Sequence, residues 1–153
     1  LAKLTRLALN ANQIGNPGLV ALSKSLDKLD KLTKLYLSVN QIGDDGVSAL
    51  ATAIGKGALA SLEVLALGKN EVGDVGLSAL AEAIKPTADR GRGALANLKT
   101  LDLRHNNIGN VGCTALASAV GEGALPALTH LEIDNNPASF EARQAAMDAI
   151  KNR

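Results

Sequence analysis

The sequence has few aromatic residues and one cysteine: its 153 residues include one Tyr, one Phe, one Cys and no Trp. A single cysteine excludes an internal disulfide, and no N-x-[ST] acceptor for glycosylation is present. Both absences favour an intracellular, cytoplasmic protein. The charges nearly cancel, with 16 Lys and Arg against 15 Asp and Glu, so we expect no nucleic-acid or membrane partner. No apolar run approaches the roughly 18 residues of a membrane helix, and no signal peptide is evident.

The usual sequence patterns of catalysis and metal binding are also missing: there is no Walker pattern, no G-x-S-x-G, no H-E-x-x-H and no C-x-x-C. Segments 55–60 and 91–96 have the pattern G-x-G-x-x-A, and 121–126 has it with Pro as the last residue, so all three imitate the fingerprint of dinucleotide sites. That fingerprint has to follow a strand and open a helix, so that the helix N-terminus faces the pyrophosphate. Here each segment follows a helical pattern and leads into a strand. We therefore expect no enzyme, no cofactor and no metal site.

One block of about thirty residues occurs five times. Each copy contains L-x-x-L-x-L-x-x-N, with Ile as the third apolar residue of the last copy, and the final Asn falls at positions 12, 40, 70, 106 and 136. The alternating apolar residues predict a strand with one buried face, and later residues such as Val47, Leu50 and Ile54 recur at helical spacing. This period predicts a stacked array in which each unit buries its apolar face against its neighbours.

The repeat resembles the leucine-rich repeat family. The tail I-G-x-x-G-x-x-A-L-A-x-A-I at 42–54 resembles its ribonuclease-inhibitor-like subclass, which includes NLR-type and RanGAP-like proteins. The expected fold is an α/β solenoid, a horseshoe arc with a parallel β-sheet on the concave face and α-helices on the convex face. We expect one domain over 1–153 with repeats at about 4–31, 32–61, 62–97, 98–127 and 128–153, the last ending in a cap helix.

The chain begins like the end of a repeat, because residues 1–4 match residues 59–62 and form no polar cap. We therefore expect the C-terminal fragment of a longer array. Solenoid ends need polar capping, so further repeats or another subunit would cover the N-terminal edge.

Two columns of polar residues recur with the repeat. The first consists of the final asparagines: Asn12, Asn40, Asn70, Asn106 and Asn136. We interpret them as structural, because buried amides need backbone partners in neighbouring turns, and in the resembled family they form an Asn ladder. The second column is expected to provide the N-caps of its own helices: Asn16, Asp44, Asp74 and Asn110. Glycines two residues further on indicate close backbone packing, and Ser139 is expected to cap the last helix.

Two local features depart from the repeat. Cys113 takes the helix position of Val47 and Leu77, so we interpret it as a packing residue rather than a reactive thiol. The third repeat has an insertion within 85–93, which contains three basic residues: Lys85, Arg90 and Arg92. These residues either contact an acidic partner, phosphate or nucleic acid, or belong to a solvated loop that the fold tolerates.

The side chains between the strand leucines vary from repeat to repeat and are expected to point out of the concave face. They would form lanes of neighbours roughly 4.8 Å apart. Asp102 and Glu132 would be neighbours of like sign that a partner's cation could relieve, and Arg104 is expected to pair with Asp134. We predict that ten of these residues bind a partner: Arg6, Lys34, Tyr36, Lys69, Asp102, Arg104, His105, His130, Glu132 and Asp134. The alternative is an ordinary solvated sheet.

The expected function is a protein–protein interaction module, a scaffold or sensor that binds a protein partner through the concave sheet face. Two alternatives remain open. An enzyme regulator such as a GTPase-activating protein is implied only by the resemblance to RanGAP-like repeats. A structural subunit of a large assembly is compatible with the uncapped N-terminal edge.

Overall fold

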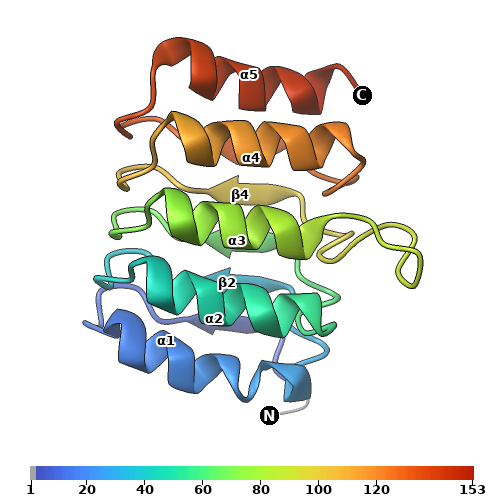
Figure 1. The fold of residues 1–153 in the computed structure, drawn as a ribbon. Coiled ribbons are helices and arrows are strands. Elements are labelled where there is room, and N and C mark those ends of the chain that lie inside the picture. Colours follow the sequence, from blue (N-terminus) through green and yellow to red (C-terminus); the bar gives the residue numbers. More distant parts are fainter. Residues whose placement is uncertain (1–2) are drawn as a thin grey trace.

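The computed structural model describes residues 3–153, in which five strands alternate with five α-helices (Figure 1). The strands are β1 (Arg6–Ala8), β2 (Lys34–Tyr36), β3 (Val64–Ala66), β4 (Thr100–Asp102) and β5 (His130–Glu132). The helices are α1 (Gly15–Ser23), α2 (Asp44–Gly55), α3 (Asp74–Ile84), α4 (Asn110–Gly121) and α5 (Phe140–Lys151). A short 3₁₀-helix, η1 (Leu26–Lys28), follows α1. Residues 1–2 lie outside the described residues. The expectation that further repeats or another subunit cover the N-terminal edge therefore stays a prediction.

The strands form one parallel sheet in the order β1-β2-β3-β4-β5, and the helices lie side by side in a second layer over one of its faces (Figure 1). This confirms the predicted α/β solenoid. The strands pair in the predicted lanes, because Arg6 lies opposite Lys34 and Asp102 lies opposite Glu132. We call the open side of the sheet, opposite the helices, the sheet face, and the outer side of the helix layer the helix face.

The core lies between the two layers and consists mainly of the repeated leucines. Leu35, Leu37, Leu65 and Leu67 have 0% exposure, and burial of each such side chain contributes about 1.5–3 kcal/mol. Cys113 is equally buried, as predicted for a packing residue. Burial raises the pKa of its thiol.

The repeat asparagines join neighbouring repeats through backbone groups. Asn70 Oδ1 accepts hydrogen bonds from the N–H groups of Asn40 and Ile42, each at 3.0 Å. Its Nδ2 group donates to the carbonyl oxygens of Leu37 (2.9 Å) and Leu67 (3.1 Å). Bonds of the same kind occur at three other positions: Asn40, Asn106 and Asn136.

The second polar column caps helices, but the prediction that each residue caps its own helix is wrong. Helices α2 and α3 begin at Asp44 and Asp74 themselves, after the N-cap glycines Gly43 and Gly73. Asp44 Oδ1 instead accepts from the N–H groups of Gly73 (2.7 Å) and Gly76 (2.9 Å) in the next helix. Neighbouring helices lie side by side, so the first turn of one reaches the unsatisfied N–H groups of the next. Two other residues of the column bond in the same way: Asn16 and Asp74.

These bonds explain the glycines of the helix starts. A Cβ on Gly76 would lie 2.7 Å from Asp44 Oδ1, and one on Gly112 would lie 2.7 Å from Asp74 Oδ1. The predicted close packing is confirmed. The last helix follows its own prediction, because Ser139 Oγ accepts from the Ala142 N–H at 3.1 Å.

Two of the three glycine-rich segments that imitate a nucleotide fingerprint are helix ends, and the third, 91–96, lies in the insertion after α3. Gly57 follows α2 with φ +103°. Its N–H donates to the Ile54 carbonyl at 2.9 Å, and the N–H of Ala58 donates to the Ala53 carbonyl at 3.1 Å. This pair of bonds is the Schellman motif, which needs the left-handed conformation that glycine adopts easily. Gly123 ends α4 in the same way, with φ +102°.

Candidate functional site

Two basic residues and one aromatic residue lie on the sheet face over β1 and β2. Arg6 and Lys34 are exposed, and Tyr36 is partly buried. The guanidinium carbon of Arg6 lies 5.1 Å from the centre of the Tyr36 ring, which is the geometry of a cation–π interaction. The contact fixes the Tyr36 ring in the lane that continues to Ala66 and Asp102.

The middle of the sheet face is smooth, because its side chains are small. Ala66 is 8% exposed, and Gly68 has no side chain. A Cβ on Gly68 would lie 3.3 Å from Asp102 Oδ2, so the Asp102 carboxylate leans over this glycine. The result is a hollow of about 390 Å³. Its lining includes three predicted site residues besides Asp102: Lys69, Arg104 and His105.

A charged cluster forms the C-terminal side of the sheet face. The Arg104 side chain donates to both carboxylate oxygens of Asp102 at 3.1 Å, and its Nε also lies 3.1 Å from Glu132 Oε2. The hydrogen bond to Asp102 and the two carboxylates raise the pKa of Arg104. The chain's own Arg104 therefore relieves the repulsion between Asp102 and Glu132, for which the sequence predicted a partner's cation.

The predicted pair of Arg104 and Asp134 is wrong. Asp134 Oδ1 instead accepts from Arg143 Nη1 at 3.0 Å, and Arg143 comes from α5. The physical reason is local: Arg104 and Asp102 are two residues apart on one face of the chain, so a two-point contact forms with little loss of freedom. Arg143 lies on α5, and the spacing of residues along the strands does not predict where this helix lies.

The two histidines of the sheet face contact neutral neighbours. His105 Nε2 lies 3.3 Å from Asn135 Nδ2, and His130 Nδ1 lies 2.9 Å from Thr129 Oγ1. Within residues 3–153, no group of three or more His, Cys, Asp or Glu side chains is placed to hold a metal ion.

Sequence reasoning missed Val39 and Gly68. Val39 is 48% exposed and lines the hollow with Gly68 and Lys69. A comparison of the equivalent positions in the five repeats could have identified Val39, because it is the one large apolar residue among them. These positions are Ala11, Val39, Lys69, His105 and Asn135. Gly68 similarly stands where the other repeats carry Asn, Ser, Arg or Asp.

The insertion uses two of its three basic residues to hold itself in place. Lys85 Nζ lies 3.0 Å from Glu82 and 3.5 Å from Glu122. Arg90 Nη1 donates to the carbonyl oxygens of Gly55 (3.3 Å) and Ala83 (3.2 Å), which lie at the ends of α2 and α3. The third basic residue, Arg92, is exposed. In Figure 1 the loop extends beyond the C-terminal end of α3.

Together, the repeated leucines, the parallel sheet and the asparagine bonds define a leucine-rich repeat protein. The sequence matches the Leucine Rich repeat family at residues 1–23, 29–51, 58–81 and 94–117, which make up more than half of the chain. The chain belongs to this family. No curated protein matches the sequence.

Several solved structures have the same fold. Actin-binding site 2 of leiomodin-1 has a TM-score of 0.72 and 17% identity, over 98% of this chain and 80% of that chain. The C-terminal domain of tropomodulin from Caenorhabditis elegans has a TM-score of 0.72 and 18% identity, over 98% and 84%. An internalin from Listeria monocytogenes has a TM-score of 0.54 and 21% identity, over 97% and 34%. At these identities the likeness shows the fold alone.

The helices of residues 3–153 are all too short or too polar to cross a bilayer.

Proposed function

We propose that this protein is a protein–protein interaction module, a scaffold or sensor, and that it binds a protein partner through the sheet face. One observation carries the proposal. The inward leucines are the same and buried in the interior repeats, whereas the outward side chains differ from repeat to repeat and most of them, Ala66 excepted, stay at least partly accessible. Arg104 and Glu132, for example, keep 47% and 45% of their side-chain surface exposed. Side chains that vary on an accessible face over a uniform buried scaffold are what specific recognition needs.

The site is largely formed before any partner arrives. Tyr36 is held against Arg6, and Arg104 is held between Asp102 and Glu132. Fixed side chains lose little freedom on binding, so more of the interaction energy remains as affinity. Tyr and Arg are also the residue types enriched at the energetic centres of protein interfaces. The hollow over Gly68 supports the proposal further, because it offers space for one side chain of a partner between these two groups.

The test is a comparison of captured proteins. The chain is immobilised as wild type, as a sheet-face variant (Tyr36→Ala, Lys69→Glu, Glu132→Lys) and as a matched α5 variant that leaves the net charge equally unchanged. The α5 variant carries three substitutions of the same kinds: Phe140→Ala, Glu141→Lys and Lys151→Glu. Proteins bound from a lysate of the source cells are quantified by mass spectrometry after circular dichroism has shown that all three chains fold.

A partner held by the wild type and the α5 variant, and reduced at least about tenfold by the sheet-face variant, is the expected result. Equal capture by all three chains would place the contact elsewhere and contradict the proposal. Purified actin is a sensible first protein to titrate, because the leiomodin-1 domain with the same fold is an actin-binding site.

A further inference from the structure

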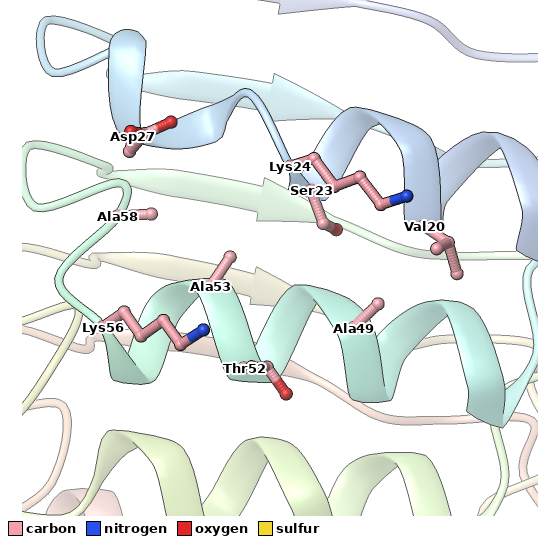
Figure 2. A pocket seen from close by; sticks show the side chains of 9 residues that line it. All are labelled: Val20, Ser23, Lys24, Asp27, Ala49, Thr52, Ala53, Lys56 and Ala58. Atoms are coloured by element: carbon pink, nitrogen blue, oxygen red, sulfur yellow. The ribbon is translucent and has the colours of Figure 1, made fainter.

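The helix face carries a groove of about 590 Å³ between α1 and α2 (Figure 2). Its origin is a departure from the repeat, because α1 has 9 residues and α2 has 12. After Ser23 the chain leaves α1 and forms η1. The C-terminal half of α2 is therefore flanked by η1 rather than by a further turn of α1.

The floor of the groove is apolar and made of short side chains. Val20 projects from α1, and Ala49, Ala53 and Ala58 project from α2 and the turn after it (Figure 2). The hydroxyl groups nearby are already used as donors: Ser23 Oγ donates to the Leu19 carbonyl at 2.7 Å, and Thr52 Oγ1 donates to the Ser48 carbonyl at 3.0 Å. The floor thus suits an apolar side chain of a visitor.

The rim of the groove is basic on both walls. Lys24 lies at the end of α1 and Lys56 at the end of α2, and both are exposed (Figure 2). Neither lysine takes part in the ion pairs formed within residues 3–153. Asp27 of η1 is the acidic residue of the lining, so the three charged groups sum to one positive charge.

The insertion lies next to the same end of the groove. Arg90 donates to the carbonyl oxygen of Gly55, which directly precedes Lys56. The exposed Arg92 belongs to the same loop. The two places where the chain departs from its repeat, the short α1 and the insertion, therefore both lie beside the C-terminal end of α2.

We propose that the α1–α2 groove is a second docking site, which takes a short amphipathic helix of a partner protein with acidic side chains beside its apolar stripe. The apolar stripe lies on Val20 and the three alanines, and the acidic side chains pair with Lys24 and Lys56. From Ala49 to Lys56 the groove runs for about 10 Å, which is two turns of a helix. A groove bounded by helices along an open side suits a helix, whereas small ligands need a site that encloses most of their surface.

The test uses three synthetic helical peptides of about 15 residues. The first has a leucine stripe flanked by Glu, the second carries Lys in place of each Glu, and the third carries Ser in place of each Leu. Binding to the 153-residue chain is followed by NMR from the methyl resonances that line the floor: Val20, Ala49, Ala53 and Ala58. The expected result is that only the acidic, leucine-containing peptide shifts these resonances.

Matched variants assign the charge contribution. Lys24→Glu with Lys56→Glu should weaken the acidic peptide about tenfold, because two attractive contacts become repulsive. Lys31→Glu with Lys151→Glu makes the same change of net charge at exposed lysines elsewhere and should leave the affinity unchanged. The sheet-face variant of the capture experiment should also leave it unchanged, since the groove lies on the other layer.

Three outcomes would overturn the proposal. The acidic peptide shifts none of the four methyl resonances, or the basic peptide shifts them equally, or the lysine control weakens binding as much as the groove variant. Decanoate, a single-chain carboxylate, is titrated in parallel. Saturation of the four resonances by decanoate but not by the peptide would make the groove a small-molecule site instead.

Discussion

Asn70 shows how one side chain connects two repeats. Its oxygen accepts from two N–H groups of the preceding repeat, and its nitrogen donates to carbonyl oxygens of both repeats. Asn12 occupies the equivalent sequence position, yet it is exposed and its Nδ2 donates only to the Asn10 carbonyl at 2.9 Å among the bonds of the described residues. We therefore expect Asn70 to contribute more than Asn12 to the free energy of unfolding.

Replacing Asn70 with Ala should lower the free energy of unfolding by about 1–3 kcal/mol, because partly buried backbone groups lose their partners. Asn12→Ala is the matched control and should change it by less than about 0.5 kcal/mol. Urea denaturation of both variants, followed by circular dichroism, measures the difference. Equal losses at the two positions would show that these asparagines do not act through the inter-repeat bonds.

Val39 combines exposure with a strained backbone. Its φ is +58°, in the left-handed region that costs a side-chain-bearing residue roughly 1–2 kcal/mol and that Asn tolerates better. Val39→Asn should therefore raise the free energy of unfolding by about 0.5–1 kcal/mol. Val111→Asn replaces a comparably exposed valine in α4 and should be close to neutral, since the two residues have similar helix propensity. Thermal melts of both variants decide the matter; a destabilised Val39→Asn would refute the strain.

At the scale of elements, each interior helix depends on its predecessor for its N-terminal cap. Asp74 Oδ1 accepts from the N–H groups of Gly109 (2.8 Å) and Gly112 (2.7 Å) at the start of α4. A negative side chain at this place also interacts favourably with the positive end of the helix dipole. The order of one helix is thereby coupled to the order of the next.

Asp74→Ala should destabilise the protein by about 1–2 kcal/mol through the loss of this cap. Asp74→Asn should keep most of the stability, because Asn16 makes the same two bonds with an amide oxygen in the first repeat. Hydrogen exchange gives the most specific readout, with faster exchange of the Gly109 and Gly112 amides expected in the alanine variant. Unchanged exchange at these amides, which belong to another repeat, would contradict capping across repeats.

Strand pairing, helix order and the lanes of the sheet face could be predicted, because they depend on residue spacing within a repeat that occurs five times. The caps were assigned to the wrong helix, because the spacing of Asp44 within its own repeat does not show that its carboxylate reaches the start of the next helix, at Gly73 and Gly76. The pairing of Arg104 with Asp102, and of Asp134 with Arg143, depends on side-chain reach and on where α5 lies.

The groove could not be predicted from the sequence, because the sequence does not show where the first repeat is shortened. The shorter first period showed only that residues were missing somewhere between Asn12 and Asn40. The structure locates the loss at the end of α1, which has 9 residues, and so beside Ala49 and Ala53 of α2. Similarly, the basic insertion was predicted as a loop, but only the structure shows Arg90 bonded to the carbonyl of Gly55.

For the whole molecule, Cys113 reports whether the solenoid is intact. The thiol is buried in the core of α4, and a thiol reagent should reach it only after unfolding. Burial raises its folded pKa above the unfolded value, so the thiol stabilises the fold below the ordinary thiol pKa and this contribution is lost as the pH rises through the folded pKa. Cys113→Val should remove the extra loss of stability at alkaline pH while keeping the packing. Labelling of Cys113 in the native protein as fast as in the unfolded chain would contradict the burial of the thiol.

The two faces of the molecule present different side chains to a partner. The sheet face presents Tyr36, the hollow over Gly68 and the cluster around Arg104, whereas the helix face presents the basic groove at Lys24 and Lys56. We propose that a protein partner binds the sheet face, and mapping the interface on this 15.6 kDa chain tests this proposal. The measurement is the change in amide and side-chain NMR resonances when the captured partner is added.

We expect the largest changes on the sheet face, at Tyr36, Lys69, Arg104 and Glu132, with little change along the outer sides of α3 to α5. Changes confined to the helices or to the two ends of the array, with the sheet-face resonances unmoved, would contradict the proposal.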